Sequence, residues 1–490
     1  MLVTDFSLDS RRAFTTYEQV VECLFGRINY ERISGSEFSV ADFKLDRMRE
    51  FLRRLGDPHR AIPAVHIAGT KGKGSTAAFV ASILRESGYR TGLFTSPHLR
   101  AFEERMTVDG RPPSQEELVG LVNRIMPVVE AMDALPAGWS PTYFEIATAL
   151  GWLYLVDRGA TVAVLEVGLG GRLDATNVCF PAVSVITTIS RDHVQQLGPT
   201  LRHIAAEKAG ILKRGVPCVT GDGKSEVLEV LERVRREVSP PEGAETPLRR
   251  VGVDFHFHWR PAEDDRTRPG DVRGDRVTIS VPPRVDGPTT TPRRSSTEGV
   301  LLEDVELPLL GEHQGLNAAV AVAAIEELRR AGWSISEEAI QRGLRATRWP
   351  GRIEVLGRRP CVVIDAGHNW AAIAALLATV ERQLPARRRI LLFAATRDKD
   401  VAGLLRQLLP AFDTVIATAY RSNPRALPVP ELVDMIRAQG AECHPAAGPD
   451  DAWQLARSMA GCEDLIVVTG SIFIAAEVRE LVTAPPDESL

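Results

Sequence analysis

The sequence contains little cysteine, and its thiols are widely spaced. Six cysteines occur among 490 residues, and no two of them form a CxxC pair. Paired cysteines at close spacing are typical of disulfide frameworks and of structural zinc sites. We therefore expect reduced thiols, no structural zinc site and a cytoplasmic location.

The chain also lacks long apolar runs and an excess of basic residues. No apolar stretch reaches the roughly 20 residues that a membrane-spanning helix needs. The first residues, MLVTDFSLDSRR, have no apolar core of the kind found in signal peptides. The formal net charge is −5, whereas proteins that bind nucleic acid cluster Lys and Arg against the phosphates. We expect neither a membrane nor a nucleic acid as the main partner, although a local positive pocket is compatible with this charge.

The composition is that of a globular protein, with 44% hydrophobic and 25% charged residues. From about residue 64, short apolar segments rich in β-branched residues alternate with helical segments, and a second such series begins near residue 361. This alternation predicts an α/β fold with mainly parallel sheets covered on both faces. We divide the chain into a P-loop-type domain, residues 1–355, and a smaller Rossmann-like domain, residues 356–490.

Residues 239–299 interrupt this alternation, because they are rich in Pro, Gly, Thr and charged residues. We interpret them as a mobile insertion in the larger domain, with VDFHFHW and RVTISV as the candidate strands of a hairpin. His256 and His258 could suggest a metal site. They are separated by one residue in strand-like sequence, however, and an edge strand is the favoured interpretation.

The segment GTKGKGST, residues 69–76, lies between an expected strand and an expected helix. Backbone N–H groups and the helix dipole at such a junction bind anions, and glycines let the chain wrap around phosphates. Lys73 could neutralise the β- and γ-phosphate oxygens. The spacing differs from GxxxxGK[ST], so a glycine-rich turn with solvated lysines is the alternative. The context favours phosphate binding by Gly72, Lys73, Gly74, Ser75 and Thr76.

Two polar residues end apolar strands, where a parallel sheet places its ligand crevice. Glu166 follows VAVL, and a carboxylate there is unfavourable without a cation or a hydrogen-bond donor. A salt bridge from Glu166 to Arg172 is the alternative interpretation. His193 follows the strand segment SVITTI, and from the residues alone a structural role for it is the more common one.

Five segments in order resemble the folylpolyglutamate synthase/dihydrofolate synthase family of the Mur ligase superfamily. They are GTKGKGST, SPHL at 96–99, EVGLGGRLDATN at 166–177, DH at 192–193 and EKAGI at 207–211. The resemblance covers most of the chain, from about residue 16 to 482, but not the insertion. The usual loop of this family is GTNGKGS, so Lys71 replaces an asparagine and adds a charge beside the phosphates.

The resemblance implies a cofactor set of ATP and two Mg²⁺ ions. It identifies Ser96, Glu166 and His193 as Mg²⁺ ligands, and Lys73, His193 and Lys208 as catalytic. It further implies that Lys208 is N6-carboxylated, which would convert a cation into an anion able to hold the second Mg²⁺. An anion is electrostatically sensible beside two metals and a triphosphate, whereas a lysine in IAAEKAGIL would otherwise be a solvated helix residue.

Three downstream motifs resemble the parts of the family that close over the nucleotide. Asn317 in GEHQGLNA would contact the nucleotide, and Arg352 in RWPGRIE would reach the phosphates from the interdomain hinge. Asp365 and His368 lie in DAGHN, where the usual form is D-x-A-H-N. Taken singly, Asn317 could cap a turn, Arg352 could form a surface ion pair and Asp365 could cap a helix. Their joint order favours the nucleotide interpretation.

The activity implied is an ATP-dependent amide ligase that works through an acyl-phosphate. It would add L-glutamate to folates, and its second candidate acceptor is dihydropteroate. Pterin-side contacts are expected at Pro97, Thr142, Phe144 and Asp174. Since one chain supplies both domains, we expect a monomer. The alternatives are another Mur-type ligase, acting on a muramyl peptide or on poly-γ-glutamate, and a non-catalytic nucleotide-binding protein.

Overall fold

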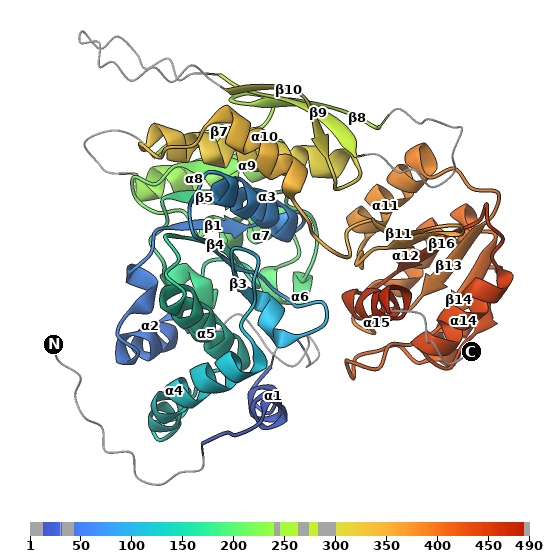
Figure 1. The fold of residues 1–490 in the computed structure, drawn as a ribbon, viewed down its shortest axis with the longest axis horizontal. Coiled ribbons are helices and arrows are strands. Elements are labelled where there is room, and N and C mark those ends of the chain that lie inside the picture. Colours follow the sequence, from blue (N-terminus) through green and yellow to red (C-terminus); the bar gives the residue numbers. More distant parts are fainter. Residues whose placement is uncertain are drawn as a thin grey trace.

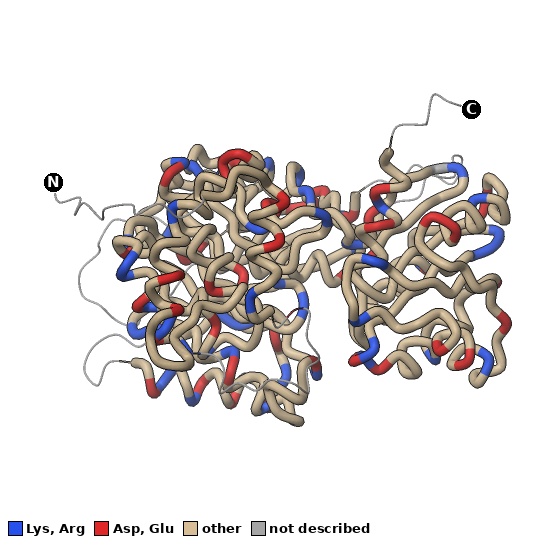
Figure 2. The backbone as a smooth tube through the Cα atoms, turned by 90° about the horizontal axis from the view of Figure 1, so that it is seen from below, with Lys and Arg blue, Asp and Glu red and all other residues tan. Residues whose placement is uncertain are grey.

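A computed structural model of the chain describes residues 13–29, 31, 44–239, 246–262, 274–282 and 300–484. The chain forms two lobes, a larger one that contains the first sheet and a smaller one built from the last third of the sequence (Figure 1). No helix in the described ranges is both long and apolar enough to cross a bilayer. Basic and acidic residues are interspersed over both lobes (Figure 2).

A seven-stranded sheet lies at the centre of the larger lobe, in the order β3-β2-β4-β1-β5-β6-β7. All neighbouring strands are parallel except β2 and β3. The strands are β1 (Ala64–Ala68), β2 (Thr91–Phe94), β3 (Met106–Val108), β4 (Val162–Glu166), β5 (Val183–Ile186), β6 (Cys218–Thr220) and β7 (Leu248–Arg250). The central strands β1, β4 and β5 are buried along their whole length, as expected for strands whose sequences are mostly apolar. The predicted parallel sheet is confirmed.

Helices cover both faces of this sheet, because successive strand residues point to opposite sides. Val65 and Ile67 of β1 pack into the core beneath α3, α9 and α10, whereas Ala64 packs into the core that holds α1, α2, α4 and α5. A third cluster lies beneath α7 and α8. The helices are α1 (Tyr17–Phe25), α2 (Leu45–Arg54), α3 (Lys73–Glu86), α4 (Gln115–Asp133), α5 (Tyr143–Asp157), α6 (Val194–Leu197), α7 (Leu201–Ala209), α8 (Ser225–Val238), α9 (Glu312–Arg330) and α10 (Glu337–Ala346).

The predicted insertion contributes to an antiparallel sheet of three strands, where the sequence analysis named two. The strands are β8 (His256–Arg260), β9 (Asp275–Val281) and β10 (Val300–Leu307), in the order β10-β9-β8. β8 is therefore an edge strand, and His256 and His258 are exposed on it, which confirms the interpretation of FHFHW. Val277 and Val305 join the core under α9. Most of the Pro-rich stretches, 240–245, 263–273 and 283–299, lie outside the described residues, so their mobility stays a prediction.

The smaller lobe is built on a six-stranded sheet in the order β11-β12-β16-β13-β14-β15. Only β11 pairs antiparallel. The strands are β11 (Glu354–Arg358), β12 (Cys361–Ile364), β13 (Arg389–Phe393), β14 (Thr414–Ala417), β15 (His444–Pro445) and β16 (Leu465–Thr469). One face packs on α11 (Trp370–Gln383), α12 (Val401–Leu408) and α13 (Val429–Arg437), the other on α14 (Pro449–Met459) and α15 (Ile472–Thr483). The doubly covered α/β sheet matches the prediction.

Candidate active site

The glycine-rich loop joins β1 to α3 and is enclosed by two segments that are distant in the sequence. Gly72 has φ of +83°, a backbone conformation that favours glycine. A Cβ at Gly72 would overlap Oδ1 of Asn317 on α9, and a Cβ at Gly74 would lie 2.9 Å from the ring of Trp349 in the hinge. Asn317 lies within α9, not at a turn. The structure therefore places two of the predicted nucleotide residues, Gly72 and Asn317, in direct contact.

Glu166 is a buried carboxylate at the end of β4, with 6% of its surface exposed. Burial raises its pKa, an effect that Lys73, the Ser96 N–H and Arg352 oppose. Its Oε1 lies 3.8 Å from Lys73 Nζ, and its Oε2 accepts a hydrogen bond of 3.3 Å from the Ser96 N–H. The alternative of a salt bridge to Arg172 is wrong, because Arg172 pairs with Glu207 at 2.9 Å. Glu166 is thus a carboxylate that further positive charge would stabilise.

Lys208 is buried on α7, with 4% of its surface exposed, so it is not a solvated helix residue. Its Nζ donates a hydrogen bond of 2.8 Å to the Gly69 carbonyl at the start of the phosphate loop. Burial, and then the charge of Lys73, lower the pKa of Lys208 to about 7. The amine is therefore readily neutral, which is the form that reacts with electrophiles.

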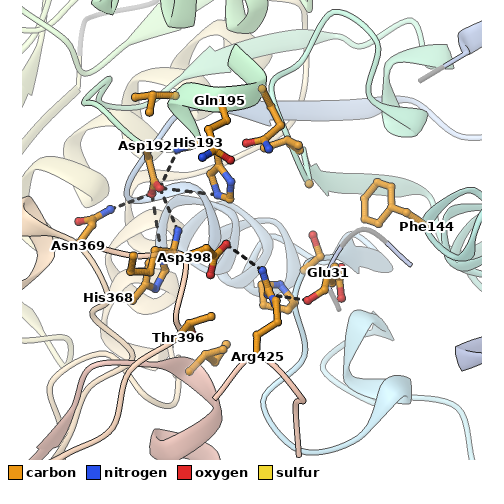
Figure 3. Close-up of a pocket in the computed structure, with 18 of the residues that line it drawn as sticks. Glu31, Phe144, Asp192, His193, Gln195, His368, Asn369, Thr396, Asp398 and Arg425 are labelled. Atoms are coloured by element: carbon orange, nitrogen blue, oxygen red, sulfur yellow. Dashed lines mark hydrogen bonds and ion pairs between the residues drawn. The ribbon is translucent and has the colours of Figure 1, made fainter. Parts of the chain in front are cut away.

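Asp192, which follows β5, connects the phosphate loop to the smaller lobe (Figure 3). Its carboxylate lies 3.2 Å from Lys71 Nζ and 3.2 Å from Lys399 Nζ, and it accepts a hydrogen bond of 2.8 Å from Asn369 Nδ2. Burial alone would raise the pKa of Asp192, but Lys71, His193 and Lys399 hold it below its usual range. Lys71, the departure from the family loop, therefore takes part in a contact between the lobes.

His193 stands beside Asp192. Its Nε2 is 3.8 Å from Asp192 Oδ1, its side chain is 45% exposed, and its φ of +49° is unusual for a residue with a side chain. Ser96 and Glu166 are in contact with each other. Within the described ranges, no group of three His, Cys, Asp or Glu side chains is placed to hold a metal.

Asp365 and Arg352 lie at the hinge between the lobes. Asp365 Oδ2 accepts from the Ile353 N–H at 3.1 Å, and its Oδ1 accepts from the Gly367 N–H at 2.8 Å. Burial raises the pKa of Asp365, and Arg352 lowers it. Asp365 is not a helix cap, because Asn369 caps α11. His368 Nε2 lies 3.4 Å from Lys71 Nζ, so this hinge segment reaches the phosphate loop.

A cavity of about 540 Å³ lies between the lobes, beside these groups (Figure 3). Phe144 stands on one side of this cavity, and Asp192 stands on the other side with His368 and Asn369. The smaller lobe contributes Thr396, Asp398 and Arg425. All four predicted substrate residues, Pro97, Thr142, Phe144 and Asp174, line it together with Ser96, Asp192, His193 and His368. Two of the three predicted metal ligands, Ser96 and His193, and all four predicted acceptor residues therefore line one cavity. Asp192 and His368 connect this cavity to the phosphate loop through Lys71.

The carboxylate of Asp174 is fully hydrogen-bonded. Its Oδ2 accepts from the N–H groups of Gly168 and Leu169 at 3.0 Å, and its Oδ1 accepts from the N–H and hydroxyl of Thr176 at 2.9 and 2.5 Å. His66 Nε2 lies 2.8 Å from Thr176 Oγ1. Because the Thr176 hydroxyl donates to Asp174, His66 must donate from Nε2. Four bonds use the usual acceptor capacity of a carboxylate, so Asp174 orders the loop at 168–176.

Phe144 and Thr142 are placed by the start of α5. Thr142 caps the helix through a capping box with Glu145, and Glu145 also pairs with the buried Arg47 at 2.8 Å. The ring of Phe144 lies against Gly168, where a Cβ would approach its Cζ to 2.5 Å. This packing holds the ring at the cavity wall and leaves it partly exposed.

Several residues of this region were not predicted from the sequence. Arg105, fully buried, pairs with Glu31 at 2.6 Å, and Arg425 of the smaller lobe donates to the Glu31 carbonyl at 2.6 Å. Lys399 and Asp398 lie in the motif DKD, to which no role was assigned from the sequence. The signal that could have identified Asp398 and Lys399 is a short charged motif that follows a strand. The partners of Lys399 and Arg425, however, lie 207 and 394 residues away along the chain.

Comparisons with known proteins agree with this geometry. A family model described as the Mur ligase middle domain matches residues 67–219, and one described as the Mur ligase, glutamate ligase domain matches residues 351–472. The dihydrofolate synthase/folylpolyglutamate synthase of Bacillus subtilis (strain 168) is 34% identical over 469 residues, covering 95% of this chain and 99% of that protein. The folylpolyglutamate synthase of Lacticaseibacillus casei is 34% identical over 439 residues, covering 89% and 93%.

Solved structures of similar proteins have the same fold. The Mycobacterium tuberculosis folylpolyglutamate synthase complexed with ADP matches with a TM-score of 0.81 at 32% identity, covering 96% of this chain and 99% of that one. Escherichia coli FolC in complex with DHPP and ADP matches with a TM-score of 0.78 at 28% identity, covering 96% and 99%.

Proposed function

Because the chain belongs to the dihydrofolate synthase/folylpolyglutamate synthase family of Mur ligases, we propose that it adds L-glutamate to folates and to dihydropteroate at the expense of ATP. The observation that carries this proposal is the cavity between the lobes. It is lined on one side by Phe144 and Asp174 and on the other by residues next to the phosphate loop. The relatives solved with ADP and with AMPPCP support ATP as the phosphoryl donor.

The reaction proceeds in two steps. The acceptor carboxylate attacks the γ-phosphorus of ATP, which forms an acyl-phosphate and releases ADP. The amine of glutamate then attacks the acyl carbon and loses a proton, and the tetrahedral adduct collapses to an amide and inorganic phosphate. Lys73 and Arg352 would neutralise the charge on the phosphoryl oxygens. The Asp192 contacts with Lys399 and Asn369 would hold the lobes together and exclude water from the acyl-phosphate.

The residues fit Mg²⁺, because burial makes the charged form of the Glu166 carboxylate unfavourable and a bound cation would compensate for this cost. Ser96 and Glu166 would hold one ion together with phosphate oxygens, and His193 would stand at the edge of this site. Mg²⁺ supplies charge neutralisation to the triphosphate and to the moving phosphoryl group when it is bound.

We propose further that Lys208 is carboxylated. Its neutral amine would attack the carbon of CO₂, forming an N–C bond and releasing one proton, so that a carbamate anion replaces an ammonium. Two features support this: the pKa of Lys208 is lowered to about 7 by burial and by Lys73, and its side chain lies at the phosphate loop. A carbamate at Lys208 would remove the repulsion between two ammonium groups, those of Lys208 and Lys73, and it could hold the second Mg²⁺.

The activity is tested with purified protein, ATP, Mg²⁺ and L-glutamate, supplied separately with dihydropteroate, tetrahydrofolate or a muramyl peptide precursor. Phosphate release and product mass are both measured. We expect a mass gain of one glutamyl unit on each of the two pterins and none on the muramyl compound. Turnover of the muramyl compound alone would contradict the proposal, and so would ATP binding without release of phosphate on any acceptor.

Replacing Thr176 by valine tests the hydrogen-bond chain from His66 to Asp174. Valine keeps the shape of threonine but removes its hydroxyl. The Nε2–H of His66 then lacks its acceptor, and Oδ1 of Asp174 loses one of its hydrogen bonds. Unsatisfied buried groups cost about 1–3 kcal/mol, so we expect the KM for the pterin acceptor to rise about tenfold or more, with the KM for ATP unchanged.

The matched control for this variant is Thr148→Val on α5. The Thr148 hydroxyl bonds to the Phe144 carbonyl in its own helix and takes no part in the Asp174 chain. Steady-state kinetics on both variants would contradict the positioning role if the acceptor KM were the same in each.

A further inference from the structure

A second cavity, of about 560 Å³, lies next to the first. Its walls come from α3, the segments around β2 and β3, the hinge at 346–352 and helix α15. Figure 1 shows α15 on the side of the smaller lobe that faces the larger lobe. Pro97 and Ile472 line both cavities. The second space therefore adjoins the first at the residues that follow Ser96.

The acidic side chains that line this second cavity already have partners. Glu104 accepts hydrogen bonds from the N–H groups of Leu99, Arg100 and Ala101. Asp109 accepts from the Thr91 N–H at 2.9 Å. Glu480 of α15 pairs with Arg100 at 3.2 Å across the lobes. The acidic side chains of the lining are therefore held in place by contacts within the protein.

The arginines that line this cavity differ in whether they have an acidic partner. Arg479 pairs with Glu354 and Arg100 pairs with Glu480, whereas Arg85 and Arg348 pair with no carboxylate in the described ranges. Arg348 donates only to the backbone carbonyls of Arg345 and Thr347, and within the described ranges Arg85 has neither a hydrogen bond nor an ion pair. Both side chains belong to exposed residues and can reorient towards a ligand. The lining thus has unpaired positive charge beside apolar side chains such as Trp349, Leu93 and Leu99.

We propose that this cavity binds the γ-linked glutamyl tail of a folate acceptor that already carries several glutamates. This inference rests on the proposed function. Each γ-glutamyl unit carries one free α-carboxylate between methylene groups, which matches guanidinium groups spaced along a partly apolar wall. Arg85 and Arg348 would bind α-carboxylates, and the Trp349 face would pack against the methylenes.

The position of the cavity agrees with the way the substrate grows. The reacting carboxylate must return to the phosphate loop in every round, while the chain between it and the pterin lengthens by one unit. The first cavity, about 540 Å³, has to hold the pterin and the reacting end. Additional units would loop out past Pro97 into the adjoining space, where the arginines stabilise their charge.

The double variant Arg85→Gln/Arg348→Gln tests this inference. We compare monoglutamyl, triglutamyl and pentaglutamyl tetrahydrofolate as acceptors, by glutamate-dependent phosphate release and product mass. We expect the KM for the monoglutamate to stay within twofold of the wild type, and the KM for the pentaglutamate to rise at least tenfold, with a weaker salt dependence than in the wild type. Arg345→Gln, an exposed arginine on α10 outside the cavity lining, is the matched control and should change neither value.

The other outcomes separate the two proposals. Equal KM changes for short and long acceptors, or no change for either, would overturn the tail site. A raised KM for ATP alone would assign the arginines to the nucleotide and would also overturn it. If the wild-type enzyme extended the monoglutamate but neither of the longer acceptors, it would have no long-tailed substrate to bind. That result would contradict the inference. Failure of the wild type on every pterin would instead contradict the proposed function.

Discussion

Replacing Lys208 by alanine is expected to reduce ligation by on the order of a thousandfold, the size of effect seen when a preorganised electrostatic group is removed from an active site. Lys208 is buried and its amine lies at the first residue of the phosphate loop. If the amine is carboxylated, its loss removes an anion that balances two metal ions and the lysines of the loop. The fold should survive, because alanine is a good helix former and no buried charge is left behind. Ligation rate and melting temperature are measured together.

Two further variants separate a carbamate from an ammonium at this position. Lys208→Arg keeps a cation that CO₂ does not carboxylate, and it should be as inactive as the alanine variant. Added acetate or propionate should partly restore the alanine variant, because a small carboxylate can occupy the vacated space, and it should not restore the arginine variant. Nuclear magnetic resonance after incubation with ¹³C-bicarbonate should show a carbamate signal that is absent from both variants. High activity of Lys208→Arg would contradict the carbamate.

Replacing Gly72 by alanine is expected to weaken ATP binding by at least about tenfold. The residue has φ of +83°, which costs an L-residue about 1–2 kcal/mol. The new methyl group would also overlap the Asn317 side chain, so that α9 or the loop must move where the phosphates bind. Affinity is measured by calorimetry with a non-hydrolysable ATP analogue.

The chain offers a close control for this variant. Gly88, after α3, has φ of +86° and nothing within 4 Å of the position of a Cβ. Gly88→Ala should therefore share the backbone penalty and the loss of melting temperature, while ATP affinity stays at the wild-type value. Equal loss of ATP affinity in both variants would mean that instability, and not the Gly72–Asn317 contact, explains the effect.

Features of the fold and site that depend on local sequence were predictable. The continuous apolar segments AVHIA and VAVLE identified buried parallel strands, and the glycine-rich junction after the first of them identified the phosphate loop. Glu166 was identified because a carboxylate at the end of a buried strand needs compensation. The structure adds its partner, Lys73, in place of Arg172.

Contacts between distant segments were not predictable from one sequence. Asp192 pairs with Lys399 and Asn369, more than 170 residues away, and no local pattern fixes such a pairing. His66 is a single histidine in an apolar strand, and its role depends on Thr176, 110 residues later. The strand β10 was missed because the Pro-rich segment before it obscured its alternation of buried and exposed residues.

Transfer of ¹⁸O from the acceptor carboxylate to phosphate would show whether the amide forms through an acyl-phosphate. The acceptor carboxylate is labelled in both oxygens, and the inorganic phosphate and the ligated product are analysed by mass after turnover with ATP and L-glutamate. An acyl-phosphate places one acceptor oxygen in each phosphate released and leaves one in the new amide. We predict one ¹⁸O atom per phosphate; unlabelled phosphate formed in step with ligated product would contradict the mechanism.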